Sequence, residues 1–390
     1  MRLLKYSVLV VIAFAVIAGG VLWYLAHQTL PVKPYVRHLP ADNAYDDYVK
    51  AAKLVRAYGY SREELDDPAT AEAAARENSE ALAAARRAFH RDCAAIWNPG
   101  TEIEFAALAS LRRLGQAFWW EGHTAELRRD YASAAGSYLD AMRLAAETSR
   151  DGQLLHGLVA IAIRSIGLSA LEGAVPHLSS DDCKLALMRV REIEGRESSL
   201  AQILDNERIY SIARLSRKQS LAPYFVNVGR PRIANFVKAN FTPKRWLIPR
   251  VDKYLAQRTA RARLPYYKRT ALPEPKHIAV RMLASVYART LRAFDRTDTQ
   301  REVVKGMLAI QAFRSKYGHL PKKLEDVAAE FLPKTPIDPY TGKPLAYKLT
   351  PGGYLLYSFG PDQDDDGGTP LNRDETSGDL VAGKLFQFAD

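Results

Sequence analysis

The sequence has only two cysteines, Cys93 and Cys183, which lie far apart in the chain. They form no C-x-x-C pair and no Cys/His spacing, which excludes the usual zinc signatures and a disulfide-dense scaffold. We favour two buried free thiols, because cysteine is among the residue types most often buried. The alternative is a single disulfide, if the chain reaches an oxidising compartment.

The short motifs of common catalytic sites are also missing. The chain has no G-x-S-x-G, no Walker-type glycine loop and no G-x-G-x-x-G, and its eight histidines show no H-x-x-H, H-E-x-x-H or H-x-H spacing. Acid pairs such as Asp46/Asp47 are typical of solvated helix faces. We therefore expect a protein without enzymatic activity. The alternative is an envelope hydrolase with an unrecognised site in the helical region.

A long apolar run is present near the N-terminus. Residues 8–26, VLVVIAFAVIAGGVLWYLA, carry no charge, and at about 1.5 Å per residue they match the roughly 30 Å hydrocarbon core of a bilayer. Arg2 and Lys5 precede the run, and Trp23 and Tyr24 fall where an interfacial aromatic belt would lie. The run is longer than an ordinary signal-peptide core and no A-x-A site follows it, which disfavours a cleaved signal peptide.

These features predict a single-pass membrane protein. Residues 1–6 would be cytoplasmic, residues 7–26 a transmembrane signal-anchor, and the bulk of the chain would lie outside the cytoplasm on the periplasmic or envelope side. Lys33 and Arg37 just beyond the run weaken the charge bias that sets this orientation. The lipid bilayer is then the first expected partner, through residues 8–26.

The remaining chain divides by composition. Residues 27–48 read as a Pro-rich spacer, residues 49–200 as a helical and partly repeat-like domain, residues 201–273 as a basic, aromatic-rich helical or irregular region, and residues 274–390 as a helix followed by a small α+β module. Ser61 with Glu64 and Ser179 with Asp182 predict capping boxes. The helix that starts near Pro275 and runs to Tyr317 is expected to break around Asp298.

The helical region weakly resembles a tetratricopeptide-type repeat. Leu114, Gly115 and Phe118 fit one half of that pattern, and Ala134, Tyr138 and Ala141 fit the other. The two halves are too far apart for a standard repeat, so a generic antiparallel helical hairpin is the alternative. In either case small residues let the helices approach while Leu and aromatic side chains fill the groove.

The basic region from residue 208 to 296 carries many more Lys and Arg than acids, interleaved with aromatics. Anionic lipid or an envelope polymer is one expected partner, since polybasic segments near a membrane gain roughly 1 kcal/mol per residue from anionic lipid. A solvated helix face is the alternative. Nucleic acid is disfavoured, because a membrane-anchored chain meets anionic headgroups before it meets DNA.

An acidic loop follows two short β-type runs near the C-terminus. Asp362, Asp364 and Asp366, followed by Gly367, read D-x-D-x-D-G, a spacing that converges alternate carboxylates on one cation. The twelfth position is Arg373 and not the Glu of an EF-hand, so that type of site fails. Later acids would have to complete the site, and a solvated acidic loop is the alternative.

The segment after Tyr317 resembles the C-terminal domain of the major pseudopilin of type II secretion systems. The run YGHLP, PIDPYTGKPLAY, GGYLLYSFG, DQDDDGG and GDLV follows the order of that family. The resemblance implies a structural calcium ion held by Asp362 and Asp379, with Asp364 or Asp366 and the backbone near Ser358. It also implies partners in a secretion or pilus-like assembly.

Two departures limit this resemblance. The membrane run lacks the prepilin cleavage signature, and about 270 residues separate it from the module where a pseudopilin has one continuous helix. The sequence therefore predicts a mainly α fold that consists of a transmembrane helix, a helical-hairpin region and a small C-terminal α+β pseudopilin-like domain with a short antiparallel sheet. The expected function is that of a non-enzymatic interaction or assembly component with a calcium-stabilised C-terminal domain.

Overall fold

The computed structural model describes the backbone of residues 2–31, 35–56, 62–99, 104–217, 241–328 and 330–387, with the side chains of 2–11, 62, 278, 279 and 282–286 left out. As predicted, the chain is mainly helical and carries a small three-stranded antiparallel sheet near its C-terminus. The elements in chain order are α1 (Arg2–His27), α2 (Tyr45–Leu54), α3 (Arg62–Leu65), α4 (Pro68–Glu77), α5 (Ser79–Ala88), α6 (Phe105–Leu127), α7 (Tyr131–Ser149), α8 (Leu154–Ala174), α9 (Ser180–Glu194), α10 (Leu200–Ser216), α12 (Lys244–Ala262), α13 (Ile278–Tyr317), α14 (Glu325–Ala328), β1 (Ala346–Thr350), β2 (Gly353–Ser358) and β3 (Leu380–Val381).

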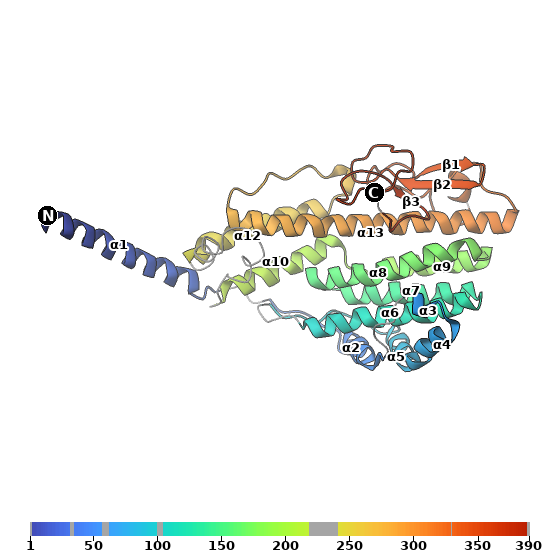
Figure 1. Cartoon of the computed structure of the whole chain (residues 1–390), viewed down its shortest axis with the longest axis horizontal. Coiled ribbons are helices and arrows are strands. Elements are labelled where there is room, and N and C mark those ends of the chain that lie inside the picture. Colours follow the sequence, from blue (N-terminus) through green and yellow to red (C-terminus); the bar gives the residue numbers. More distant parts are fainter. Residues whose placement is uncertain are drawn as a thin grey trace.

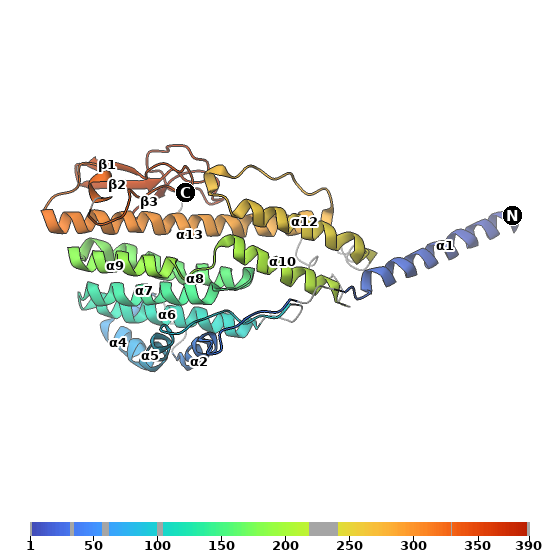
Figure 2. The ribbon, with the colours of Figure 1, turned by 180° about the vertical axis from the view of Figure 1, so that it is seen from behind.

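The helices stack in layers, and α1 projects away from them (Figures 1 and 2). Helices α2 to α5 form one outer layer, α6 and α7 the next, and α8 and α9 the one after that. Helix α13 covers α8 and α9, and the sheet lies on the opposite side of α13. The sheet is therefore separated from the rest of the body by a single helix.

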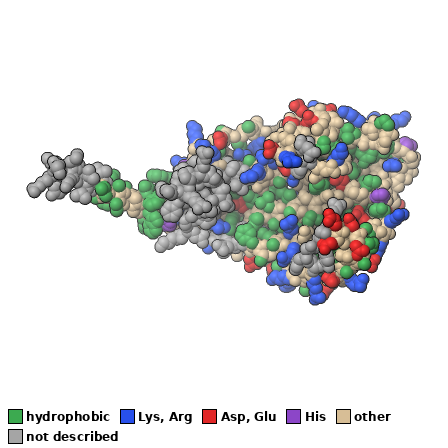
Figure 3. Space-filling model, viewed as in Figure 1, with side chains coloured by type: hydrophobic (Ala, Val, Ile, Leu, Met, Phe, Trp, Pro, Cys, Tyr) green, Lys and Arg blue, Asp and Glu red, His purple; other side chains and the backbone are tan. Residues whose placement is uncertain are grey.

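Helix α1 is apolar along its described side chains. Figure 3 shows the described part of this stalk as largely hydrophobic, and Phe14, Val16 and Ile17 are 74, 68 and 65% exposed. Among the residues with described side chains, Leu154–His177 is long and apolar enough to cross a membrane. The described part of α1, Ile12–His27, is a shorter apolar helix. The Leu154–His177 stretch contains α8, which packs against α7, α6 and α13 and is a core helix of the body.

Helices α6 and α7 form the antiparallel hairpin that the sequence predicts, joined by residues 128–130, and α8 packs against both. Gly167 of α8 explains the close approach of α7 and α8. A Cβ at this position would lie 2.6 Å from the carbonyl oxygen of Tyr138 and 2.8 Å from Met142. Any side chain larger than hydrogen would therefore push the two helices apart.

Helix α13 is continuous for 40 residues, so the predicted break around Asp298 is wrong. The polar run there satisfies itself within the helix, because the hydroxyls of Thr297 and Thr299 donate to the carbonyls of Ala293 and Asp295 at 2.7 and 2.8 Å. No Pro or Gly interrupts this part of the helix. The polar residues around Asp298 therefore do not mark the end of a helix.

Ion pairs fix α13 against α8 and α9. Arg301 is 2.7 Å from Glu197 and 2.9 Å from Glu194, and Arg164 of α8 donates to Asp298 at 2.8 Å. Both arginines are largely buried, and breaking one partner of such a pair would leave an uncompensated buried charge. The pairing therefore sets the position of α13 along the body.

One hydrophobic core links the helices to the C-terminal sheet. It extends from Ala134 of α7 through Val303 and Leu308 of α13 to Leu356 of β2 and Leu385 near the end of the described chain. The carboxylate of Glu172 on α8 also accepts the backbone N–H of Gly383 and Leu385, at 2.6 and 3.3 Å. The C-terminal segment is thus built into the body.

The predicted hairpin is confirmed. Strands β1 and β2 are antiparallel, with Thr350 opposite Gly353 across the Pro351–Gly352 turn. Strand β3 adds to β2 after the acidic loop, so the sheet order is β1-β2-β3.

Other predictions have mixed outcomes. The capping box of Ser179 and Asp182 is present at the start of α9, and Ser61 lies outside the described residues. The described parts of the basic region are the regular helices α10 and α12, with Pro249 inside α12, and the irregular residues 263–273, which include a 3₁₀ turn at Tyr266–Lys268. Cys93 and Cys183 are buried free thiols, as favoured, and burial raises the pKa of each.

Acid should destabilise the body through His156, which is 1% exposed. Burial lowers the pKa of His156 to about 4 from 6.5, so the unfolded chain binds a proton that the folded chain refuses as the pH falls from 6.5 to about 4. Stability should decline across that window, by about 1.4 kcal/mol for each pH unit once the pH is well below 6.5 and until it nears 4. We expect His156→Gln to remove this part of the decline and the exposed His90→Gln to leave it, as measured by urea unfolding at pH 7 and pH 4.5. An unchanged decline in His156→Gln would contradict this assignment.

Candidate functional site

The acidic loop lies between β2 and β3 and folds back on the sheet (Figure 1). The Asp362 carboxylate accepts the backbone N–H of Gly378 at 3.2 Å. The carboxylate of the next residue, Asp379, accepts the backbone N–H of Gly368 at 2.7 Å. Asp362 and Asp379, which the resemblance implies would share a cation, each accept a backbone N–H from another part of the loop, Asp362 from Gly378 and Asp379 from Gly368.

Asp379 is the buried member of this group. Its side chain belongs to a residue that is 1% exposed, and its Oδ1 has no hydrogen-bond partner. Burial, together with the neighbouring charges of Asp366 and Asp365, raises the pKa of Asp379 to about 6, although the bond from Gly368 lowers it. A buried carboxylate oxygen without a donor is satisfied by a proton or by a cation.

The other predicted ligands lie differently. Asp364 and Asp366 are exposed on the loop. The hydroxyl of Ser358 donates to Asp338 at 2.7 Å. Asp338 is fully buried and also accepts the backbone N–H of Tyr340 and of Phe359. The Ser358 side chain therefore holds the turn before β1 and is turned to Asp338, away from the acidic residues of the loop.

Asp365 was missed by the sequence analysis. Its carboxylate accepts the hydroxyl of Tyr357 at 2.6 Å and the backbone N–H of Gly367 at 3.1 Å, with Lys348 at 3.8 Å. These contacts pin the tip of the loop to β1 and β2. In the D-x-D-x-D pattern Asp365 is the skipped position, so no local signal assigned it a role.

The donor set fits a cation in part. Asp379 offers an orphaned buried oxygen, and the charges of the carboxylates Asp366 and Asp365 act on it, which is the oxygen chemistry that calcium prefers. Within the described ranges, no three His, Cys, Asp or Glu side chains are already arranged to hold a metal ion. The exposed carboxylates would have to turn toward Asp379 to complete a site.

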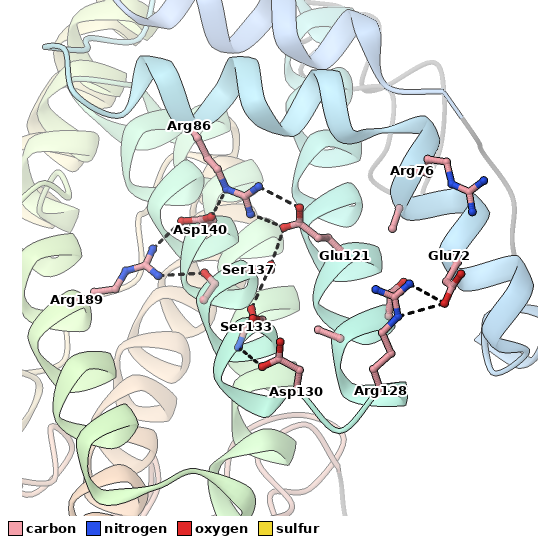
Figure 4. Close-up of a pocket in the computed structure, with 14 residues that line it drawn as sticks. Glu72, Arg76, Arg86, Glu121, Arg128, Asp130, Ser133, Ser137, Asp140 and Arg189 are labelled. Carbon is pink, nitrogen blue, oxygen red and sulfur yellow. Dashed lines mark hydrogen bonds and ion pairs between the residues drawn. The ribbon is translucent and has the colours of Figure 1, made fainter.

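A second polar feature is a cleft of about 600 Å³ between α4–α5 and the helices α6, α7 and α9 (Figure 4). Arg86 of α5 donates to Asp140 at 2.7 Å and to both oxygens of Glu121, and Arg189 of α9 donates to the other oxygen of Asp140 at 2.6 Å. Ser137 donates to Glu121 at 2.6 Å. Burial raises the pKa of Glu121, but the bonds from Arg86 and Ser137 outweigh it and the net pKa is low.

In this cleft, ion pairs of Arg86 and Arg189 hold the helix layers together. Of the described residues that line it, none is a histidine or a cysteine, and Asp140 and Glu121 are both neutralised by arginine. The hydrolase alternative requires a carboxylate or imidazole free to move a proton. The paired carboxylates of this cleft do not favour it.

The third feature is the basic face of α12, defined here as Arg245, Trp246, Pro249, Arg250, Lys253 and Gln257. These side chains are exposed and recur at helical spacing on one side of α12, opposite the buried Leu247 and Val251. The acid within the helix, Asp252, is bound by Arg208 at 2.7 Å. Trp246 is 59% exposed.

Helix α12, which carries the basic face, lies beside the point where α1 leaves the body (Figure 1). Helix α1 contacts α12, and the backbone N–H of Leu30 donates to the carbonyl of Ser216 at the end of α10 at 2.9 Å. Lys244 at the start of α12 donates to the carbonyl of Arg217. The apolar stalk and the basic face are therefore held together by the folded chain.

Gly360→Ala should destabilise the loop strongly. Gly360 has φ +66°, and a Cβ there would collide with the backbone carbonyl of Gly378. We expect a loss of at least about 2 kcal/mol in the free energy of unfolding, from left-handed strain and the collision together. Gly352→Ala is the matched control, because a Cβ at Gly352 meets nothing within 4 Å. Equal melting temperatures of the two variants would contradict this geometry.

Comparison of the chain with protein-family models, with curated proteins and with solved structures finds no match. The resemblances to the major pseudopilin domain and to a tetratricopeptide-type repeat therefore rest on the quoted residues alone.

Proposed function

We propose that this chain is a membrane-anchored, envelope-facing protein without enzymatic activity that acts as an interaction or assembly component of a type II secretion or pilus-like system. Its C-terminal loop would be stabilised by calcium. The observation that carries the proposal is the apolar stalk α1, which leaves the body with its described side chains uncovered. The secretion-related part rests on the resemblance of the segment after Tyr317.

The exposure of α1 supports a membrane anchor. Each large apolar side chain moved from water into hydrocarbon contributes roughly 1.5–3 kcal/mol, and α1 presents Phe14, Val16, Ile17 and Val21 to solvent with no acid on the described part of the helix. Trp23 and Tyr24, 50 and 65% exposed, come at the end nearest the body, where an interfacial belt would form.

The placement of Arg37 supports the expected orientation. Its guanidinium donates to the carbonyls of Ala95 and Asp151 at 2.7 and 3.0 Å and lies over the ring of Trp97. Arg37 is thus bound by the folded body. The positive charges of Arg2 and Lys5 before the span then favour a cytoplasmic N-terminus.

The basic face of α12 would rest on anionic headgroups beside the anchor. It combines three cations with an exposed indole, which is the composition of interfacial helices. An envelope polymer with acidic groups is the competing partner for the same charges.

A cysteine-accessibility experiment tests this contact. The native Cys93 and Cys183 are buried, so an introduced cysteine should be the reactive one. We expect Gln257→Cys on the basic face to react several-fold more slowly in nanodiscs with phosphatidylglycerol than in phosphatidylcholine nanodiscs. Met188→Cys on α9, 62% exposed in the wild type and far from α1, is the control and should not respond. Equal rates for Gln257→Cys in both lipids would refute contact with anionic lipid.

Calcium should stabilise the full chain through Asp379. A ligand present at about 100-fold its Kd stabilises the folded state by about 2.7 kcal/mol, which raises the melting temperature of a protein of this size by about 3 °C. We expect that rise in calcium relative to chelator at pH 7.5, where the Asp379 carboxylate is ionised. Asp379→Asn should abolish the rise, and the exposed Asp374→Asn should keep it. The full chain is required because the C-terminal segment shares the core of the body. An equal melting temperature of the wild-type chain in calcium and in chelator would contradict the calcium proposal.

A further inference from the structure

A cavity of about 360 Å³ opens between α2, α6, α8 and α10. None of its described lining residues belongs to the acidic loop or to the basic face. Three buried aromatic rings and a buried imidazole line the cavity, with two acids. These residues are Tyr45, Trp97, Tyr210, His156, Asp46 and Glu104. Its volume is that of a site for a small organic molecule.

The walls are aromatic. Trp97 and Tyr210 meet edge to face with centroids 6.3 Å apart, and the ring of Tyr45 lies 6.1 Å from that of His156. All four residues are at most 5% exposed, so the fold fixes their rings. Rigid aromatic surfaces attract both apolar groups and cations, because the face of an aromatic ring is negative.

The charge of the lining is negative although the chain as a whole is at +11. Asp46 and Glu104 are both exposed at the cavity, and neither has an ion pair among the described residues. The nearest cations are engaged elsewhere. Arg37 is bound to backbone carbonyls and Arg214 donates to the hydroxyl of Tyr210 at 3.1 Å, and neither lines the cavity.

His156 adds a polar group that the fold leaves unsatisfied. The residue is 1% exposed and its Nδ1 has no hydrogen-bond partner. Because burial lowers its pKa to about 4, the imidazole is neutral at pH 7 and keeps a lone pair that accepts a hydrogen bond. His156 is hydrogen-bonded to the backbone of Ile96, while its buried Nδ1 is left without a partner, so this unsatisfied atom points to a ligand.

We propose that this cavity binds a small organic cation, a primary ammonium carried on a ring or a short hydrocarbon. The rings of Tyr45, Trp97 and Tyr210 would enclose its apolar part. Its ammonium would donate to His156 and face the carboxylates of Asp46 and Glu104. A neutral ligand would leave both carboxylates without a counter-charge, and an anionic ligand would be repelled by them. The proposal is independent of the membrane and calcium proposals.

Three probes of one shape test the charge preference. Isothermal titration calorimetry of the full chain in uncharged detergent would compare 2-phenylethylammonium with the neutral 2-phenylethanol and the anionic phenylacetate. We expect the ammonium to bind at least about tenfold more tightly than the alcohol, since a charge-assisted hydrogen bond is lost with the charge, and phenylacetate to give no binding. Equal binding of the ammonium and the alcohol would overturn the proposal, as would an absence of ammonium binding up to about 10 mM.

A variant locates the site. Glu104 precedes α6 and makes no side-chain capping bond, so Glu104→Gln should leave the helix intact. We expect it to weaken 2-phenylethylammonium by about tenfold and to leave 2-phenylethanol unchanged. Glu80→Gln on the exposed face of α5 is the control with the same loss of charge. If Glu80→Gln and Glu104→Gln weakened the ammonium equally, the effect would come from the overall charge and the proposed site would be wrong.

Discussion

The fold depends on one helix that is buried on two sides. Helix α13 packs against α8 and α9 with one side and against β2 and β3 with the other. Its run from Val303 to Ala312 is accordingly apolar almost all around, interrupted by Lys305, which lies 3.0 Å from Glu194, and by Gln311, which donates to the carbonyl of Leu178 at 2.9 Å. A helix in that position cannot slide or rotate without exposing apolar surface to water, so it fixes the sheet relative to the helical body.

Electrostatics complete what the apolar contacts begin. Arg301 and Arg164 join α13 to α9 and α8, and Arg86 and Arg189 join α5 and α9 to the carboxylate of Asp140. In both places one arginine binds two carboxylates at once through its planar guanidinium: Arg301 binds Glu194 and Glu197, and Arg86 binds Asp140 and Glu121. These ion pairs define how the layers align, whereas the hydrophobic core supplies the driving force for their association.

The sequence predicts the local parts of this fold and misses the long-range ones. The capping box of Ser179 and Asp182 and the hairpin around Pro351–Gly352 are encoded within a few residues and were predicted. The continuity of α13 at Asp298 was missed, because Arg164, which neutralises Asp298 together with Arg301 of the same helix, comes from a distant part of the chain.

The candidate sites divide in the same way. A cation site of Asp362 and Asp379 was expected from the resemblance of the C-terminal motifs and stays a prediction; the structure bonds Asp362 to Gly378 and Asp379 to Gly368. The partnership of Ser358 with Asp338 and that of Asp365 with Tyr357 were not predicted. The aromatic cavity is built from five separate segments between Tyr45 and Tyr210, none of which has a motif of its own.

The bonds from Gly383 and Leu385 to Glu172 have a consequence for the order of events during synthesis. More than 200 residues separate these partners, and the core that they close includes side chains of α7, α8 and α13. Until β3 has been synthesised, the side of α13 that packs against the sheet exposes apolar surface to water and is prone to aggregation. The native packing is therefore completed only after Gly383 and Leu385 have been synthesised, and until then the nascent chain must be kept from self-association.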